Sequence, residues 1–119
     1  MRIESVSAGE VFVFGSNAAG AHSGGAARFA YDRLGAVWGQ SEGLQGKSYG
    51  IDTMSGLGVF EEQARRFLDF AREHPELRFL VTEVGCGIAG YTPEQVAAFF
   101  RSAPENVVLP DSFLRVLGA

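Results

Sequence analysis

An apolar run at residues 11–14 stops at a long segment of small and polar residues, 15–27, which leads directly into a helical stretch at residues 28–34. This order predicts a strand, a glycine-rich turn and a helix, with the turn at the carboxyl end of the strand. Backbone N–H groups and the positive end of the helix dipole both point into such a turn. The segment is therefore predicted to bind an anion such as a phosphate group.

The rest of the chain alternates between strand and helix patterns. Strands are predicted at residues 10–14, 47–52, 77–84 and 106–109, and helices at residues 24–34, 59–73 and 92–102. Residues 40–46 are predicted to be irregular, and the tail at 110–119 to hold one helical turn. Such alternation predicts an α/β fold, in which helices cover a mostly parallel sheet and residues 77–84 form its central buried strand.

Composition narrows the class of protein. A chain of 119 residues, 46% of them hydrophobic, is expected to form one domain over residues 1–119. A net charge of −4, with basic residues scattered among acidic ones, argues against general nucleic-acid binding. The single cysteine excludes an internal disulfide, and with only two histidines no zinc set is expected. Without a long apolar run or a signal-like start, we expect a cytoplasmic protein that needs neither a metal nor a cofactor.

A second glycine-rich loop follows the predicted strand at 77–84. It has three glycines within residues 85–91 and precedes a helix start, where Thr92 suits the N-cap, Pro93 the first helical position and Gln95 a capping box. Strand-to-helix turns often need glycine for conformation alone, and neither loop matches a Walker A sequence. Because ligands of parallel sheets bind outside the carboxyl ends of the strands, the two loops are expected to converge on one cleft.

The motifs of both loops resemble those of a small macrodomain, the fold that binds ADP-ribose. The resemblance rests on Gly15-Ser16-Asn17, on Ser23-Gly24-Gly25-Ala26-Ala27, on Val84-Gly85-Cys86-Gly87-Ile88 and on residues 44–53. It covers about residues 11–109 and is strongest toward short phage-associated and bacterial proteins with a Phe-Gly-Ser-Asn start and a Gly-Cys-Gly loop. It implies a three-layer α/β/α fold and binding of ADP-ribose or a related nucleotide diphosphate. Hydrolysis of an ADP-ribosyl ester or glycosidic bond is a further activity that the resemblance leaves open.

The resemblance also implies a set of ligand contacts. Asn17 would contact the distal ribose, Gly24 and Gly25 would let the ligand approach the backbone, and residues 85–90 would wrap the diphosphate. Tyr91 would either stack on the distal ribose or pack against the next helix. The implied contacts are Gly15, Ser16, Asn17, Gly24, Gly25, Ala26, Gly85, Cys86, Gly87, Ile88, Ala89, Gly90 and Tyr91.

Two features depart from the family pattern. Residues 1–9 lack the Gly-Asp-Ile/Val-Thr segment whose aspartate holds the adenine amine in most macrodomains. Ala89 stands where the related glycohydrolases carry an aspartate after the Gly-Cys-Gly-Leu turn. The resemblance therefore implies neither that adenine contact nor that glycohydrolase mechanism for this chain.

Three functions stay open on the sequence. The first is a binder of an ADP-ribose-like nucleotide that also hydrolyses it, with Asn17, His22 and Asp52 as candidate catalytic residues, although a carboxylate at a strand end also serves as a turn former. The second is a non-catalytic module for nucleotide sensing or protein interaction. The third is a hydrolase in which His22 activates Cys86 as a nucleophile. The alternative for Cys86 is a buried cysteine without a chemical role.

Overall fold

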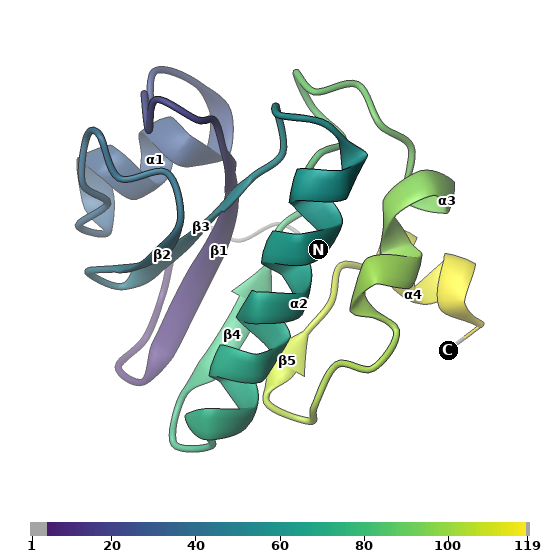
Figure 1. Ribbon diagram of the computed structural model, residues 1–119. Helices are drawn as coiled ribbons and strands as arrows, with labels where there is room; N and C mark the ends of the chain where they lie inside the picture. The colour runs from purple at the N-terminus through teal and green to yellow at the C-terminus, as the bar shows by residue number, and fades with distance from the viewer. Residues whose placement is uncertain (1–4, 119) are drawn as a thin grey trace.

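The computed structural model describes residues 5–118, which form a five-stranded sheet, four α-helices and one 3-10 turn (Figure 1). In chain order these are β1 (Glu10–Ser16), α1 (Gly25–Arg33), β2 (Gly43–Gln45), β3 (Ser48–Asp52), α2 (Leu57–Glu73), β4 (Arg78–Val81), α3 (Pro93–Val96), η1 (Ala97–Phe100), β5 (Val107–Val108) and α4 (Asp111–Leu117). Within this described part of the chain, no helix has the length and apolar character needed to cross a membrane. Residues 1–4 and 119, which the domain prediction includes, lie outside it.

The sheet has the strand order β2-β3-β1-β4-β5. Strand β1 pairs in parallel with β3 and β4, and β4 with β5, whereas β2 pairs antiparallel with β3. The expected α/β fold with a mostly parallel sheet is therefore confirmed. The prediction that residues 77–84 form the central strand is wrong, because β1 lies in the middle and β4 is its neighbour.

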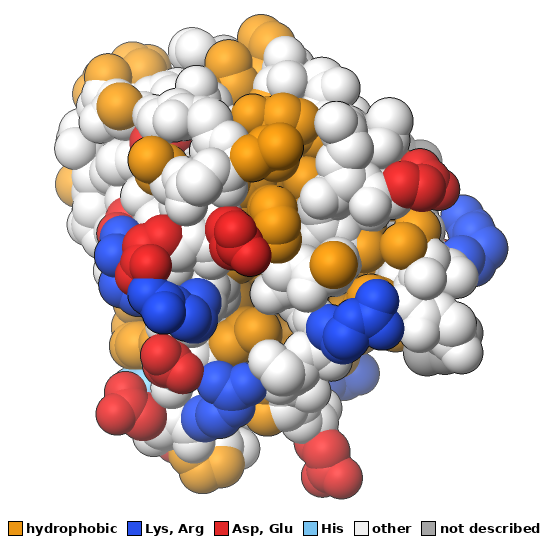
Figure 2. Space-filling model, turned by 45° about the vertical axis from the view of Figure 1, so that its right-hand side comes forward, with side chains coloured by type: hydrophobic (Ala, Val, Ile, Leu, Met, Phe, Trp, Pro, Cys, Tyr) orange, Lys and Arg blue, Asp and Glu red, His pale blue; other side chains and the backbone are white. Residues whose placement is uncertain are grey.

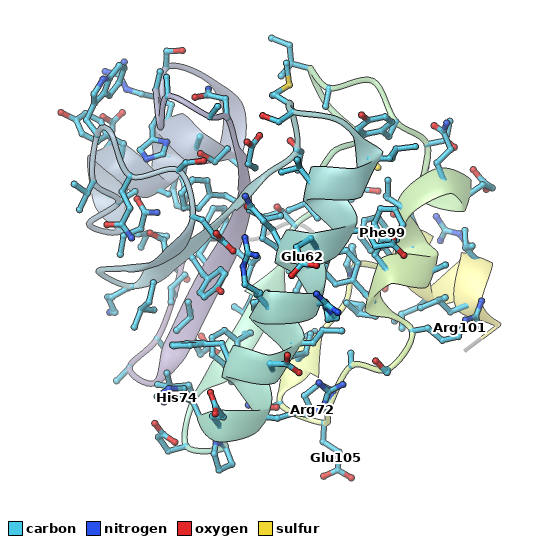
Figure 3. All side chains as sticks on the ribbon, viewed as in Figure 1. Glu62, Arg72, His74, Phe99, Arg101 and Glu105 are labelled. Carbon is cyan, nitrogen blue, oxygen red and sulfur yellow. The ribbon has the colours of Figure 1, made fainter. Side chains whose placement is uncertain are left out.

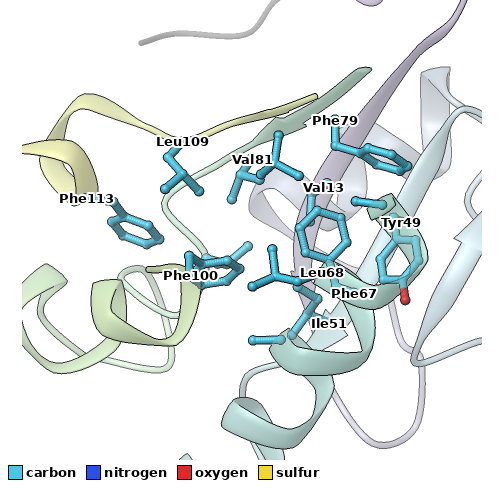
Figure 4. Packing of buried hydrophobic residues seen from close by; sticks show 14 of the residues in the cluster. Val13, Tyr49, Ile51, Phe67, Leu68, Phe79, Val81, Phe100, Leu109 and Phe113 are labelled. Carbon is cyan, nitrogen blue, oxygen red and sulfur yellow. The ribbon is translucent and has the colours of Figure 1, made fainter. Parts of the chain in front are cut away.

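Helices cover both faces of the sheet because β1 is apolar on both of its sides. Phe12 and Phe14 pack on the face covered by α1, while Val11 and Val13 belong to the larger core on the face covered by α2, η1 and α4. Figure 4 shows this larger core, in which side chains of the sheet meet Phe67 and Leu68 of α2, Phe100 of η1 and Phe113 of α4.

Helix α2 matches its predicted range, 59–73, to within two residues at its start and coincides with it at its end. Its outward side is charged, and Arg66 forms ion pairs with Glu62 one turn away and with Glu42, which directly precedes β2. Figure 3 shows Glu62 and Arg72 along this side and His74 at the end of the helix. Figure 2 shows charged side chains of both signs spread over the middle and lower part of one face, with hydrophobic side chains most frequent toward its top.

The hairpin β2–β3 corrects the expectation that residues 40–46 are irregular. A two-residue turn, Gly46 and Lys47, separates Gln45 from its partner Ser48. Gly46 has a φ of +63°, and a Cβ there would lie 2.5 Å from the carbonyl oxygen of Leu34. The hairpin therefore depends on contact with the end of α1, which a three-residue strand pattern cannot reveal.

Other boundaries also differ from their predicted positions. The strand ladder of β4 stops at Val81 instead of residue 84, because Thr82 donates both its N–H and its hydroxyl to the carbonyl of Val13 as the chain turns away. The helix predicted at 92–102 starts at Pro93 as expected, and Gln95 Oε1 accepts the Thr92 N–H at 2.8 Å. It then tightens into η1, where the consecutive Phe99 and Phe100 both contact Phe60.

Candidate functional site

A cleft of about 440 Å³ opens at the carboxyl ends of the parallel strands β1, β3 and β4. A Cβ placed on Gly15, near the end of β1, would lie 3.2 Å from Thr53 Oγ1 and 3.7 Å from the backbone nitrogen of Gly85. The two glycine-rich segments therefore meet here, as expected. The cleft is lined by Gly15, Ser16, Asn17, Ala21, Ser23, Gly24, Gly25, Ala26, Ala27, Thr53, Met54, Thr82, Glu83, Val84, Gly85, Gly87, Ile88 and Ala89.

The first turn of α1 forms part of the cleft wall. Its N-cap, Gly24, is extended, and within the described residues no side chain caps this end and no acidic residue lies in its first turn. The N–H groups of that turn have no helical acceptor and carry the positive end of the helix dipole. The wall therefore offers neutral hydrogen-bond donors to an anion.

Glu83 is the one ionisable residue that the described part of the chain contributes to the lining, so no Lys or Arg in that part takes a place there. Its Oε2 accepts a hydrogen bond from the hydroxyl of Ser112 on α4. Attraction of an anion to this cleft consequently depends on N–H donors and dipoles instead of a cationic side chain.

The glycines of the cleft fall into two kinds. Around Gly24 and Gly87 there is open space, since a Cβ at either position would meet no atom within 4 Å among the described residues. Gly85 has a φ of +80°, and a Cβ there would lie 2.5 Å from a ring carbon of Phe60. Gly85 is thus required by packing, whereas Gly24 and Gly87 leave room for a ligand.

Asn17 lines the cleft, but its amide already closes the first loop. Its Nδ2 donates to the carbonyl of Ala21 at 2.9 Å, and its Oδ1 accepts the Ala21 N–H at 2.9 Å. The amide keeps one N–H and one lone pair for a further partner. The ribose contact implied by the resemblance would use only this remaining capacity.

His22, a candidate catalytic base, is fully buried outside the cleft lining. Its Nε2 lies 2.9 Å from the carbonyl of Val37 and 3.2 Å from Gln45 Oε1, and both of these oxygens accept its proton. Its ring packs edge-on against Phe14 and Trp38. His22 therefore joins the first loop to the β2–β3 hairpin and does not present a base to the cleft.

Asp52, the candidate general base at the end of β3, holds its own loop together. Its carboxylate accepts hydrogen bonds from the N–H of Met54 and the hydroxyl of Ser55, and its N–H donates to the buried Gln63. The residue is buried and is absent from the lining, where the following Thr53 and Met54 take part instead. The structure thus gives Asp52 the turn-forming role that the sequence left as its alternative.

Three expected contacts of the second loop, Cys86, Gly90 and Tyr91, also lie outside the lining. The centroids of the Tyr91 and Phe60 rings lie 6.2 Å apart. The backbone N–H of Tyr91 donates to the carbonyl of Gly85 and so closes the loop. Burial raises the pKa of the Cys86 thiol, and the charges of Glu83 and Glu94 raise it further. This thiol is consequently a poor nucleophile at neutral pH.

Sequence reasoning missed part of the lining, namely Ala21, Ser23, Ala27, Thr53, Met54, Thr82, Glu83 and Val84. A usable signal exists for Thr53 and Met54, because they follow the carboxyl end of a predicted parallel strand. Glu83 was missed because the strand was predicted to run to residue 84, whereas it ends three residues earlier, at Val81. No comparable signal marks Ala21 and Ala27 as ligand contacts.

Comparisons with protein-family models, curated proteins and solved structures found no match to this chain. The residues of the described part of the chain also include no group of three or more His, Cys, Asp or Glu that could hold a metal ion.

Proposed function

We propose that this chain binds ADP-ribose or a related nucleoside diphosphate derivative, in the manner that its resemblance to a three-layer, macrodomain-like α/β/α fold implies. The observation that carries the proposal is that residues from two segments distant in the sequence, 15–27 and 82–89, line one cleft at the carboxyl edge of parallel strands. The cleft volume of about 440 Å³ is within the usual range of small-molecule sites, about 300–1,000 Å³.

The charge of the cleft favours a ligand whose diphosphate is esterified at both ends over a ligand that ends in a free phosphate. A terminal phosphate carries about 1.5 to 2 negative charges at pH 7, and a phosphate within a diester about one. Neutral N–H donors of α1 suit the lower charge, and Glu83 repels the higher one. ADP-ribose, with about two negative charges, is therefore expected to bind more tightly than ADP, which carries about 2.5 to 3.

Calorimetric titration with ADP-ribose, alongside ADP, AMP and NAD, tests the proposal. The informative variant is Gly87→Glu, which places a carboxylate where the cleft is open. Its matched control is Gly58→Glu, because Gly58 also has open space around it, has no positive φ and is not among the lining residues. Micromolar binding of ADP-ribose is expected, lost by about 100-fold or more in Gly87→Glu and kept in Gly58→Glu.

If none of the four nucleotides gives binding heat, the proposal is refuted. Equal affinity of the two glycine variants, whether kept or lost in both, would also count against it, since the binding would then not depend on the open space at Gly87 in the cleft. Circular dichroism and thermal unfolding of each variant verify that the fold is intact.

Hydrolysis of the bound ligand is a second candidate function, and Glu83 is the observation that favours it, as an ionisable group among the lining residues. A carboxylate at that place can accept a proton from an attacking water. Chromatography of an ester-linked ADP-ribosyl peptide after incubation distinguishes turnover from simple binding. If turnover occurs, Glu83→Gln is expected to lower kcat without weakening the affinity for ADP-ribose. Recovery of the ADP-ribosyl peptide with its ester bond uncleaved would indicate a non-catalytic binding module.

A further inference from the structure

A second hollow, of about 420 Å³, lies between the β2–β3 hairpin and the side of α2, and its lining shares no residue with that of the cleft. We propose that this hollow, called the groove below, binds a linear aliphatic diamine. One ammonium group would lie on each of two carboxylates, and the methylene chain would lie over two aromatic rings. Neither the ligand nor the residues belong to the nucleotide cleft, so this inference is independent of the proposed function.

The groove contains a buried tyrosine whose hydroxyl has no partner in the described part of the chain. Tyr49 is only 4% exposed, yet it lines the groove, and no hydrogen bond engages its hydroxyl there. Figure 4 shows the Tyr49 ring at the edge of the packed cluster, with its hydroxyl on the outer side. Burial and the charge of Glu42 raise the pKa of Tyr49 to about 12, so the hydroxyl keeps its proton at neutral pH. A buried polar group without a partner in the protein needs one from outside it.

Phe70 gives the groove a second aromatic ring. The centroids of the Phe70 and Tyr49 rings lie 5.3 Å apart, and both residues line the groove. Phe70 is only partly buried, unlike Phe67 on the same helix, so part of its ring stays open to a ligand. The face of an aromatic ring attracts a cation, and its apolar surface gains from cover by methylene groups. Two such rings favour an organic cation over an inorganic one.

Two carboxylates of the groove are open to a cation. Glu42 is already engaged, because its two oxygens accept hydrogen bonds from Arg66 at 2.8 and 2.9 Å. Asp69 uses one oxygen, Oδ1, for Arg72 at 3.0 Å, and Glu73 has no ion pair within the described residues. No three carboxylates, histidines or cysteines in that part of the chain are placed to hold one metal ion. The open carboxylates therefore suit separate ammonium groups.

The spacing of the two open carboxylates favours a ligand with two ammonium groups. Asp69 and Glu73 are four positions apart on α2 and both line the groove, so their Cβ atoms are about 5–6 Å apart on one side of the helix. Phe70 lies next to Asp69 and three positions before Glu73, so a chain that joins the two ammonium groups passes beside its ring. A diamine with about four methylene groups matches this separation.

Titration of the isotope-labelled whole chain with putrescine, followed by amide chemical shifts in two-dimensional NMR at low ionic strength, tests the proposal. Saturable shifts are expected in β2, β3 and the last two turns of α2, with a dissociation constant of about 0.1–1 mM. Shifts that do not saturate, or that NaCl at the same ionic strength reproduces, overturn the proposal. Saturable shifts confined to the residues of the nucleotide cleft overturn it as well.

A second probe, Nα-acetyl-lysine methylamide, distinguishes a free diamine from a lysine side chain of a partner protein. It carries one ammonium group on a similar methylene chain, so it leaves one of the two carboxylates without a partner. It is expected to bind about three- to fivefold more weakly than putrescine. Equal or tighter binding of the lysine probe overturns the assignment of a diamine.

Two variants each remove one contact. Tyr49→Phe keeps the ring and removes the hydroxyl that the fold leaves unpaired, and Glu73→Gln keeps the size of the side chain and removes its charge. Each is expected to weaken putrescine by about three- to fivefold, with an unchanged Tm. Glu61→Gln is the matched control and should keep the affinity, since Glu61 is an exposed glutamate of α2 outside the groove lining. Unchanged affinity in both groove variants, or an equal loss in Glu61→Gln and Glu73→Gln, overturns the proposal.

Discussion

Gly85 and Gly87 lie two positions apart in one loop and have opposite tolerance for a side chain. A Cβ on Gly85 would meet the ring of Phe60 at 2.5 Å and would hold a φ of +80°, whereas a Cβ on Gly87 would enter open space. The sequence shows only that both residues are glycine. The difference could not be predicted from it, because it depends on a phenylalanine from α2 that packs under the loop.

Alanine substitution at the two glycines is expected to separate their roles. Gly85→Ala should lower the free energy of unfolding by about 2–4 kcal/mol, from the clash with Phe60 and the left-handed backbone. Gly87→Ala should change it by less than about 0.5 kcal/mol. Urea unfolding of both variants measures the difference, and equal effects would contradict the packing described for Gly85.

The thiol of Cys86 offers a second prediction for a single residue. Because burial and the charges of Glu83 and Glu94 raise its pKa above the ordinary 9.0, little thiolate forms at neutral pH. Alkylation by iodoacetamide is expected to be slow at pH 7 and to accelerate as the pH rises, with a midpoint above 9.0. The rate is followed by mass spectrometry across the pH range.

The variant Glu83→Gln provides the control for this titration. Removing that charge should shift the midpoint downward and speed alkylation at a fixed pH, since Glu83 raises the pKa of the thiol. A midpoint at or below the ordinary value in the unmodified chain would mean that Cys86 is activated. Such a result would revive the hypothesis of a Cys86-dependent hydrolase.

At the scale of elements, the local hydrophobic pattern predicted the long periodic helix and missed the short elements. Helix α2 was predicted closely because its apolar positions repeat over four turns and His74-Pro75 ends the pattern. Strand β2 was missed because three residues hold no period, and it exists through the turn at Gly46. The change from α3 to η1 was also missed, because nothing in residues 93–100 marks it apart from two adjacent phenylalanines that share a packing partner.

The junction of α2 with β5 depends on one side chain, Asn106. Its Nδ2 lies 2.9 to 3.1 Å from the carbonyl oxygens of Ala71, His74 and Leu77, and these three acceptors share its two N–H groups where α2 ends. Asn106→Ala is expected to cost about 1–3 kcal/mol of unfolding free energy, and Asn106→Asp more, because a carboxylate would face the same three carbonyls. Thermal and urea unfolding measure both variants.

Ser102→Ala is a suitable control for Asn106, since Ser102 contacts Arg72 of the same helix from the exposed surface. It should change the unfolding free energy by less than about 0.5 kcal/mol. A rank order in which Asn106→Asp is no worse than Asn106→Ala would contradict the role of the amide as a donor.

At the scale of the whole molecule, the topology explains why the candidate site was partly predictable. Parallel strands direct their carboxyl ends to one edge, so two glycine-rich loops after two such strands could be placed together without knowing the packing. The direction of individual side chains was not predictable in this way. His22 and Asp52 follow or end the same strands as the lining residues. Hydrogen bonds to the β2–β3 hairpin and to the loop between β3 and α2 nevertheless direct their side chains away from the cleft.

The overall charge leads to a prediction about salt. The chain has a net charge of −4, Glu83 is the ionisable residue that the described part of the chain places in the cleft lining, and the proposed ligand is an anion. Long-range electrostatics should therefore oppose binding, and salt should screen that repulsion. Between about 50 mM and about 500 mM NaCl, the dissociation constant for ADP-ribose is expected to stay constant within about twofold or to decrease slightly.

The same titration with Glu83→Gln shows whether the cleft carboxylate is the source of the repulsion. In that variant, affinity at low salt should rise and the remaining dependence on salt should flatten, because the nearest negative charge is gone. A dissociation constant that instead increases by about tenfold over this range would require attraction between the ligand and cationic side chains. The anion would then be held outside the cleft, near the arginines of α1 or α2, and the N–H donors of α1 would not be its main contacts.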